Sequence, residues 1–351
     1  MSDHLSFLSG SKENSWRPAM TANTTNPSYW LNWRVLLCAI WILVSMVLAA
    51  ICILKNEGNG GSRPQSGENE KEKEGFLYED ETWRPCLKEI HPAWLLAFRV
   101  ICFFVLLVLL IVTAVVDGVS IFYYYTQWTF ALVTIYFGLG SLLSIYGCYQ
   151  YHNRVHGDRV THGQLDTELG TYTNGVSSEN FNRSNMTKNL GPNEPYRDRQ
   201  PAGFWGYIFQ IIFQMNAGAV ILTDCVFWFV IVPFLAVKDY NLNFLIINMH
   251  SINVVLLLGD TALNCLRFPW FRIGYFFLWT CVYVIFQWIV HACIFFWWPY
   301  PFLDLSSLFA PLWYFLVAVL HIPCFGAFAL IMKLKHVLLT RWFPQSYQCV
   351  R

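Results

Sequence analysis

A row of polar residues lies within the apolar stretch Phe244–Leu266. Five residues of this stretch recur at steps of three and four, namely His250, Asn253, Leu257, Asp260 and Asn264. That spacing places them on one face of a helix. An imidazole or a carboxylate inside a membrane is costly unless it is paired or solvated, and a histidine is the side chain most often used as a general base. The stretch therefore predicts a polar stripe, with His250 as its candidate for chemistry.

A base needs a nucleophile, and two threonines in another apolar stretch lie at a suitable depth. With a rise of ~1.5 Å per residue, His250 lies ~9 Å in from the start of its helix. Thr134 has a similar depth in the stretch Trp128–Tyr149, and Thr129 lies at the mouth of that stretch. A threonine hydroxyl is a weak nucleophile that needs a base within hydrogen-bond reach. The sequence thus predicts Thr134 or Thr129 as nucleophile and His250 as base, with Thr134 favoured.

Further polar residues are expected to support this site. Asp224 and His291 approach from the same half of their own apolar stretches, and Asp224 is the better candidate to orient the imidazole. Asn253, one turn from His250, would donate to the oxyanion of a reacting ester. Asp260 belongs to the same polar stripe but lies ~15 Å along the helix, too far to orient the His250 ring.

Two other interpretations of these residues stay open. Polar side chains often only hold a membrane bundle together, each hydrogen bond contributing about 0.6 kcal/mol. That interpretation is favoured for Asn253, Asn264, Gln210 and Gln214, and for His321 beside Pro323. A zinc-dependent lipid amidase would use His250, His291, His321 and Asp224, but no metal-ligand spacing supports that set. We therefore expect neither a metal nor a cofactor.

The elements that position these residues are membrane-spanning helices. Of the 351 residues, 56% are hydrophobic, 18% aromatic and 13% charged, and that charged share is about half of what a soluble domain carries. About 20 apolar residues cross a ~30 Å hydrocarbon layer. Seven stretches reach that length: Val35–Leu54, Ala93–Val116, Trp128–Tyr149, Tyr207–Leu235, Phe244–Leu266, Ile273–Phe296 and Leu312–Met332. The expected fold class is all-α, a polytopic membrane bundle of about seven transmembrane helices.

Polar segments separate the spans and define the expected organisation. Residues 55–92 and 150–203 have little apolar surface and no helix or strand period, so they are expected to be disordered cytosolic loops. The remaining parts are a luminal or extracellular tail at 1–34, an extra N-terminal helix at 35–54, helices 2–3 at 93–149, helices 4–7 at 204–332 and a cytosolic tail at 333–351.

The distribution of Lys and Arg predicts the orientation. With seven spans, one side carries 18 of the 23 basic residues and the other carries four. The basic side is expected to be cytosolic, so the N-terminus faces the lumen or exterior, in an endomembrane or the plasma membrane. Cys86 and Cys349 then lie on the reducing side, and no disulfide is expected.

Three motifs resemble known families. Tyr125–Phe130 (YTQWTF), Asn248–His250 (NMH) followed by Asp260, and Trp298–Leu303 (WPYPFL) look like plant multi-pass membrane proteins of the Rolling stone-like group. More distantly, Ala93 to Met332 is similar to the androgen-induced protein family, membrane hydrolases that cleave fatty-acid esters of hydroxy fatty acids. This resemblance implies that His250 is the partner of a threonine nucleophile. The family places that threonine four residues after a tryptophan, which is Leu132 here, with Thr129 and Thr134 on either side.

Two function classes follow. One is an intramembrane threonine/histidine hydrolase with a lipid ester as its substrate and membrane lipid as its partner. The alternative is a non-enzymatic membrane protein, such as a Rolling stone-like fusion or adhesion factor, a receptor or a channel. A formal charge of +1, without a basic run in a binding motif, argues against nucleic acid as a partner. The sequence indicates no protein partner.

The orientation has a direct test, because Asn23 begins an Asn-X-Thr acceptor on the side expected to be luminal. Asn23→Gln should remove one glycan from the expressed chain, seen as faster migration on a gel. Asn182→Gln and Asn185→Gln, which alter acceptors on the expected cytosolic side, should leave migration unchanged. A glycan on Asn182 or Asn185 would show the opposite orientation.

Overall fold

The structure is a computed structural model, and it describes residues 22–57, 75–169, 199–235 and 244–349. Seven of its helices are long and apolar enough to cross a membrane. They occupy Trp33–Glu57, Pro92–Asp117, Tyr125–Arg154, Phe204–Pro233, Leu245–Leu263, Trp270–Cys293 and Ala310–Trp342. The expected all-α, polytopic helix bundle is confirmed, and the protein is a multi-pass integral membrane protein.

The main helices are α3 (Trp33–Glu57), α4 (Pro92–Asp117), α5 (Tyr125–Leu169), α6 (Phe204–Val226), α9 (Ile273–Cys293) and α10 (Ala310–Trp342). Two short helices, α7 (Phe244–Met249) and α8 (Ile252–Leu263), together make one broken span. The shorter elements are α2 (Pro27–Trp30), the 3-10 helices η2 (Glu79–Thr82), η3 (Val119–Tyr123), η5 (Trp270–Arg272) and η6 (Pro301–Leu303), and the π-helix η4 (Phe227–Leu235).

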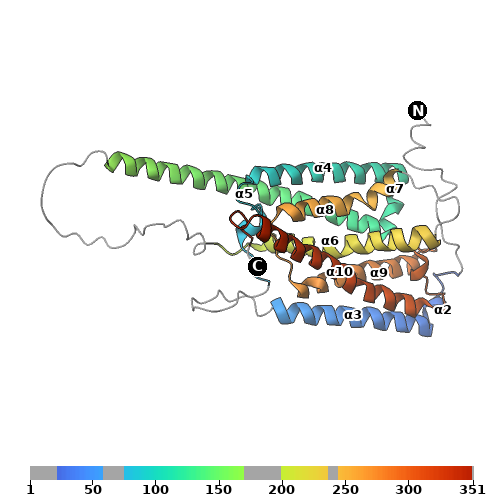
Figure 1. Cartoon of the computed structure of the whole chain (residues 1–351). Coiled ribbons are helices and arrows are strands. Elements are labelled where there is room, and N and C mark those ends of the chain that lie inside the picture. The colour runs from blue at the N-terminus through green and yellow to red at the C-terminus, as the bar shows by residue number, and fades with distance from the viewer. Residues whose placement is uncertain (1–21, 58–74, 170–198, 236–243, 350–351) are drawn as a thin grey trace, which may run out of the picture.

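Helix α6 forms the centre of the bundle. It packs against α5, α8, α9 and α10, and twelve of its 23 residues are buried. Helices α4 and α5 pack together on one side of α6, while α3 packs on α9 and α10 at the opposite edge (Figure 1). The outward faces of α3 and α4 expose large aliphatic side chains, as lipid contact requires. The interior of the bundle is therefore the place for polar residues.

The loop expected at 150–203 is shortened by α5. This helix begins at Tyr125 and continues beyond its membrane-spanning part to Leu169, so 150–169 are helical rather than irregular. The expectation of disorder was wrong there because it rested on polar composition, which a helix outside the membrane tolerates. Residues 170–198 lie outside the described part of the chain.

The loop expected at 55–92 also contains folded structure. Residues 75–91 form a cap at one end of the bundle, with η2 at its centre, while 58–74 lie outside the described part. Leu77, Trp83 and Cys86 are buried in this cap. The Trp83 ring lies directly over Gly147 of α5, where any side chain would clash with it. Expecting a disordered loop here was wrong because a few large apolar residues anchor a segment whose average composition is polar.

A buried ion pair joins the cap end of the bundle. Arg99 of α4 donates from Nε to Oδ1 of Asp260 on α8 over 2.7 Å, and both side chains are fully buried. The Tyr136 hydroxyl of α5 and the Asn264 amide donate to Oδ2 of Asp260 over 2.5 and 2.7 Å. Arg99 also donates to the Ser144 hydroxyl and to the Thr82 carbonyl of the cap. This network fixes α4, α5, α8 and the cap relative to one another.

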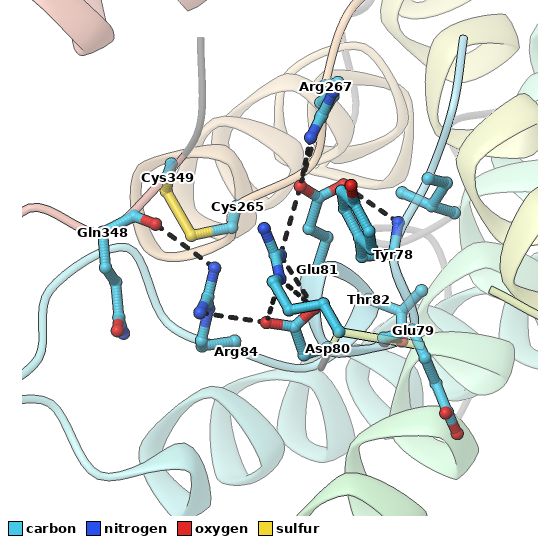
Figure 2. Close-up of polar contacts among 12 residues, drawn as sticks. Tyr78, Glu79, Asp80, Glu81, Thr82, Arg84, Cys265, Arg267, Gln348 and Cys349 are labelled. Carbon is cyan, nitrogen blue, oxygen red and sulfur yellow. Dashed lines mark hydrogen bonds and ion pairs between the residues drawn. A yellow bond between two sulfur atoms is a disulfide. The ribbon is translucent and has the colours of Figure 1, made fainter. Parts of the chain in front are cut away.

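A second polar cluster lies outside the membrane-spanning segments, within the cap (Figure 2). Glu81 is buried and accepts from Arg267 at 2.9 Å and from Arg199 at 3.3 Å. Asp80 accepts from Arg199 and Arg84, at 2.7 and 2.9 Å. Burial raises the pKa of the Glu81 carboxyl, and the guanidinium groups of Arg267 and Arg199 oppose that shift. The cluster joins the cap to the α6 and α8–η5 regions.

The C-terminal tail returns to this cap and is joined by a disulfide to the segment that follows α8. Cys265, just after α8, is bonded to Cys349 in the tail, with a Cα–Cα distance of 5.1 Å (Figure 2). The expectation that no disulfide forms is therefore contradicted. It was derived from the assumed compartment alone. The tail brings the two cysteines together by pairing with the cap, because Gln348 N donates to the Cys86 carbonyl and Cys86 N to the Leu263 carbonyl.

The ion pair should be a main source of stability. Asp260→Ala leaves the Arg99 guanidinium buried without its partner, which costs about 3–5 kcal/mol, so the melting temperature in detergent should fall by roughly 5–15 °C. The double variant Arg99→Met, Asp260→Leu leaves no buried charge and should be clearly more stable than Asp260→Ala. Equal melting temperatures for Asp260→Ala and the unaltered protein would contradict this role.

The disulfide is tested by peptide mapping. After free thiols are blocked in intact cells, non-reducing digestion should yield one linked peptide pair that contains Cys265 and Cys349. Cys349→Ser should abolish this pair, while Cys86→Ser, which removes a nearby free thiol, should preserve it. Recovery of Cys265 and Cys349 as separately blocked thiols would show that the bond is not formed in the cell.

Candidate functional site

The position of His250 is set by a break in its span. Helix α7 ends at Met249 and α8 begins at Ile252, with Ser251 in a non-helical conformation between them. The His250 carbonyl at this break accepts a hydrogen bond from Nε1 of Trp228 over 3.0 Å. Non-helical backbone at membrane depth is tolerated where it is buried in protein and its polar groups are satisfied. The break turns the His250 side chain into the bundle, where it is buried.

A second irregularity faces His250 from the end of α6. The helix changes to the π-helix η4 at Phe227, and Pro233 within η4 has no N–H to continue an α-helical ladder. The Phe227 ring stacks on the His250 imidazole, with ring centres 3.6 Å apart and planes within 2° of parallel. Such wide turns inside helices are frequent at functional sites. Two local departures from α-helix therefore meet at this histidine.

Asp224 is the nearest acidic partner of His250. Its Oδ1 lies 3.9 Å from Nδ1 of His250, which is longer than a hydrogen bond. Both atoms are buried, and neither has a hydrogen-bond partner among the described residues. Unpaired buried polar atoms are rare in folded proteins and call for an explanation. The expected approach of Asp224 to His250 is therefore seen in the geometry, as a close pair that is not yet bonded.

A cavity lies beside this pair. Its volume is about 60 Å³, which is room for roughly four water-sized spheres. It lies between α5, α6, α9 and α10, and most of its wall is aliphatic or aromatic. The polar side chains in its wall are His250, Thr126, Thr223, Thr280, and the phenols Tyr125, Tyr283 and Tyr300. A small apolar cavity with a few convergent polar groups is the usual form of a ligand site.

The three threonines of this wall differ in their contacts. Thr223, one residue before Asp224, donates its hydroxyl to the Ala219 and Val220 carbonyls of its own helix. Thr126, in the first turn of α5, has its hydroxyl oxygen 3.5 Å from the Tyr300 hydroxyl. The Thr280 hydroxyl lies 2.9 Å from the Tyr125 hydroxyl and 2.8 Å from Nε2 of His321. Thr126 and Thr280 are therefore the threonines of this cavity whose hydroxyls contact other side chains.

The threonines expected from the sequence lie elsewhere on α5. Thr129 and Thr134 are buried, and their hydroxyls donate to the Tyr125 and Phe130 carbonyls over 3.1 and 2.9 Å. Neither is among the residues that line the His250 cavity. Asn253, expected to donate to an oxyanion, gives its amide to the Met249 carbonyl. The side chains of Thr129, Thr134 and Asn253 thus donate to backbone carbonyls, which is what a purely structural role would require.

The remaining expected residues are spread over the bundle. Asp260 is held by Arg99 at the opposite end of the span, consistent with its expected separation from His250. His291 stacks on Trp298 and its Nδ1 lies 2.7 Å from the Gln287 carbonyl. His321 contacts the Val317 carbonyl and the Thr280 hydroxyl. In the described part of the chain, no three His, Cys, Asp or Glu residues gather as metal ligands would, so the alternative zinc set is not assembled there.

Three residues beside His250 were not predicted from the sequence: Thr126, Phe227 and Tyr300. Thr126 and Tyr300 lie inside the two motifs at 125–130 and 298–303, and that was the available signal. Depth along a helix was estimated correctly enough to bring Asp224 to His250. It carries no information on helix rotation, and rotation decides which threonine faces the cavity.

Comparison with known proteins adds no assignment. No family model matches this chain, and no curated protein or solved structure matches it. The likeness to the Rolling stone-like group and to the androgen-induced hydrolases stays a sequence-based prediction. The function is therefore argued from the site itself.

Proposed function

We propose that this protein binds a lipid ester inside the membrane and hydrolyses it, with His250 as general base. One observation carries the proposal: among the described residues, Nδ1 of His250 and Oδ1 of Asp224 are buried without a hydrogen-bond partner, and His250 lines a cavity whose wall also holds threonines. Other buried side chains, such as Asn253 and Gln214, also have an unpaired oxygen among the described residues. His250 and Asp224 differ from them because their two unpaired atoms face each other at 3.9 Å. A mostly apolar cavity within a membrane protein suits a lipid.

The chemistry of such a site has two steps. In the first, a threonine oxygen bonds to the ester carbonyl carbon while His250 takes the hydroxyl proton, and the carbon–oxygen bond to the alcohol then breaks as His250 returns that proton to the leaving alcohol. In the second, water attacks the acyl-threonine with His250 again as base, which releases the fatty acid and restores the hydroxyl. The sum is ester plus water to acid plus alcohol. Asp224, 3.9 Å from Nδ1, would orient the ring.

Thr126 is the nucleophile that we favour. It lines the same cavity as His250, and its hydroxyl lies near that of Tyr300. Tyr300 would then hold the Thr126 oxygen toward the cavity. Thr223 and Thr280 share the cavity, but the Thr223 hydroxyl donates to backbone carbonyls, and the Thr280 hydroxyl lies between the Tyr125 hydroxyl and Nε2 of His321. Thr129 and Thr134, predicted from depth, would need a rotation of α5 to reach His250.

The histidine is tested first. His250→Ala should lower hydrolysis of 4-methylumbelliferyl palmitate and labelling by a fluorophosphonate probe at least 100-fold, since a positioned base contributes about 10²–10⁴-fold. His291→Ala is the matched control, because it removes a buried histidine outside this cavity. It should keep activity within about threefold in protein that elutes as a single species.

The threonines are tested in the same assay. Thr126→Val should abolish hydrolysis, whereas Thr134→Val and Thr129→Val should retain it. If the unaltered protein neither hydrolyses the ester nor binds the probe, and His250→Ala only lowers the melting temperature, the enzymatic proposal is overturned. The non-enzymatic alternative would then be the better description.

A further inference from the structure

A second cavity adjoins the one at His250. It has a volume of about 50 Å³ and lies between α3, α9 and α10. Five residues belong to the walls of both cavities: Thr280, Val284, Phe302, Leu303 and Val317. The two spaces are therefore separated by no more than the thickness of these side chains.

The shared wall has a single polar contact point, and it is satisfied internally. Thr280 lies at its centre, with its hydroxyl oxygen 2.9 Å from the Tyr125 hydroxyl and 2.8 Å from Nε2 of His321. The other four shared residues are apolar. An apolar chain that passes this point meets no unpaired polar atom at Thr280. Nδ1 of His250, which has no partner among the described residues, belongs to a residue that lines the inner cavity and not the second one.

The second cavity opens toward the lipid. Two tryptophans line it, Trp41 on α3 and Trp313 on α10, and the Trp313 side chain is 41% exposed on the outer surface of the bundle. The neighbouring face of α3 exposes Leu36, Ile40 and Leu43. Lipid chains therefore lie directly outside this cavity in a membrane. From there the inner cavity lies beyond the shared wall.

We propose that the two cavities form one passage for a single hydrocarbon chain, which enters from the bilayer between α3 and α10 and leads to His250. The substrate class is then a lipid with one acyl chain per ester at the site, and not a phospholipid with two parallel chains. Each cavity has room for roughly four water-sized spheres, which leaves no space for two chains side by side. That the bound lipid is a substrate rests on the proposed function. The passage itself is inferred from the geometry of the two cavities.

The test uses binding, so that it does not depend on hydrolysis. The protein is placed in nanodiscs of dioleoyl phosphatidylcholine and irradiated with a palmitate methyl ester that carries a mid-chain diazirine and a terminal alkyne. Labelling should be saturable, should be competed by methyl palmitate, and should map to peptides of α9 and α10 that contain Val284 and Val317. The two-chain lipid of the disc is present in large excess, so a passage that accepted it would show no saturable labelling.

Val317→Trp should block the passage, because Val317 lines both cavities. Saturable labelling should fall at least 10-fold. The matched control is Val319→Trp, two residues further on α10, at a position that is 43% exposed and lines neither cavity. It should keep labelling within twofold. Val284→Phe serves as a second blocking variant should Val317→Trp fail to elute as folded protein.

The outcomes separate the two proposals. Equal saturable labelling of Val317→Trp and Val319→Trp, or labelling that is confined to outward faces and not competed, overturns the passage. Saturable labelling that both blocking variants lose, in a protein without ester hydrolysis, supports the passage and removes the enzymatic function. Hydrolysis that persists in Val317→Trp and Val284→Phe would retain the enzyme and exclude this route.

Discussion

The fold depends on one buried ion pair, that of Arg99 and Asp260. A charge in the hydrocarbon region costs several kcal/mol unless it is paired, so α4 and α8 are held to the one arrangement in which guanidinium and carboxylate meet at 2.7 Å. Tyr136 adds α5 to the same arrangement by donating to Asp260. Because the pair fixes the rotation of α8 about its axis, it also determines which face of α8 turns toward α6.

The candidate site lies where the regular helices end. At His250 the span breaks between α7 and α8, and at Phe227 the helix α6 widens into η4. Each irregularity alone leaves backbone groups to be satisfied, and the Trp228 indole satisfies one of them at the His250 carbonyl. The ion pair at the cap end and the two irregularities at the other end have complementary roles. The ion pair makes the bundle rigid, and the two irregularities leave unpaired side-chain atoms beside a cavity.

The sequence predicted the spans well because hydropathy and length determine them, and the polar stripe from Asn253 to Asn264 is buried as its period predicted. The partner of Asp260 was not predicted, although Arg99 was the one basic residue within a span. The nucleophile was uncertain for a different reason. The depth of a residue follows from a fixed rise per residue along the helix. The rotation of α5 that places Thr126, rather than Thr129, in the wall of the His250 cavity follows from the packing of α5 on α6. The cap at 75–91 was missed because Leu77 and Trp83 are few among many polar residues.

The contact between the C-terminal tail and the cap bears on the orientation of the protein in the membrane. The bias of Lys and Arg predicts that this end is cytosolic, where a structural disulfide is rare, whereas the Cys265–Cys349 bond is typical of an oxidising compartment. The docking of the tail does not require that bond, because Gln348 already pairs with the Cys86 backbone and Cys86 with Leu263. The two cysteines are thus brought together by hydrogen bonds in either compartment. Their oxidation state in the cell therefore reports which side of the membrane this end occupies, and the fold of the cap does not depend on it.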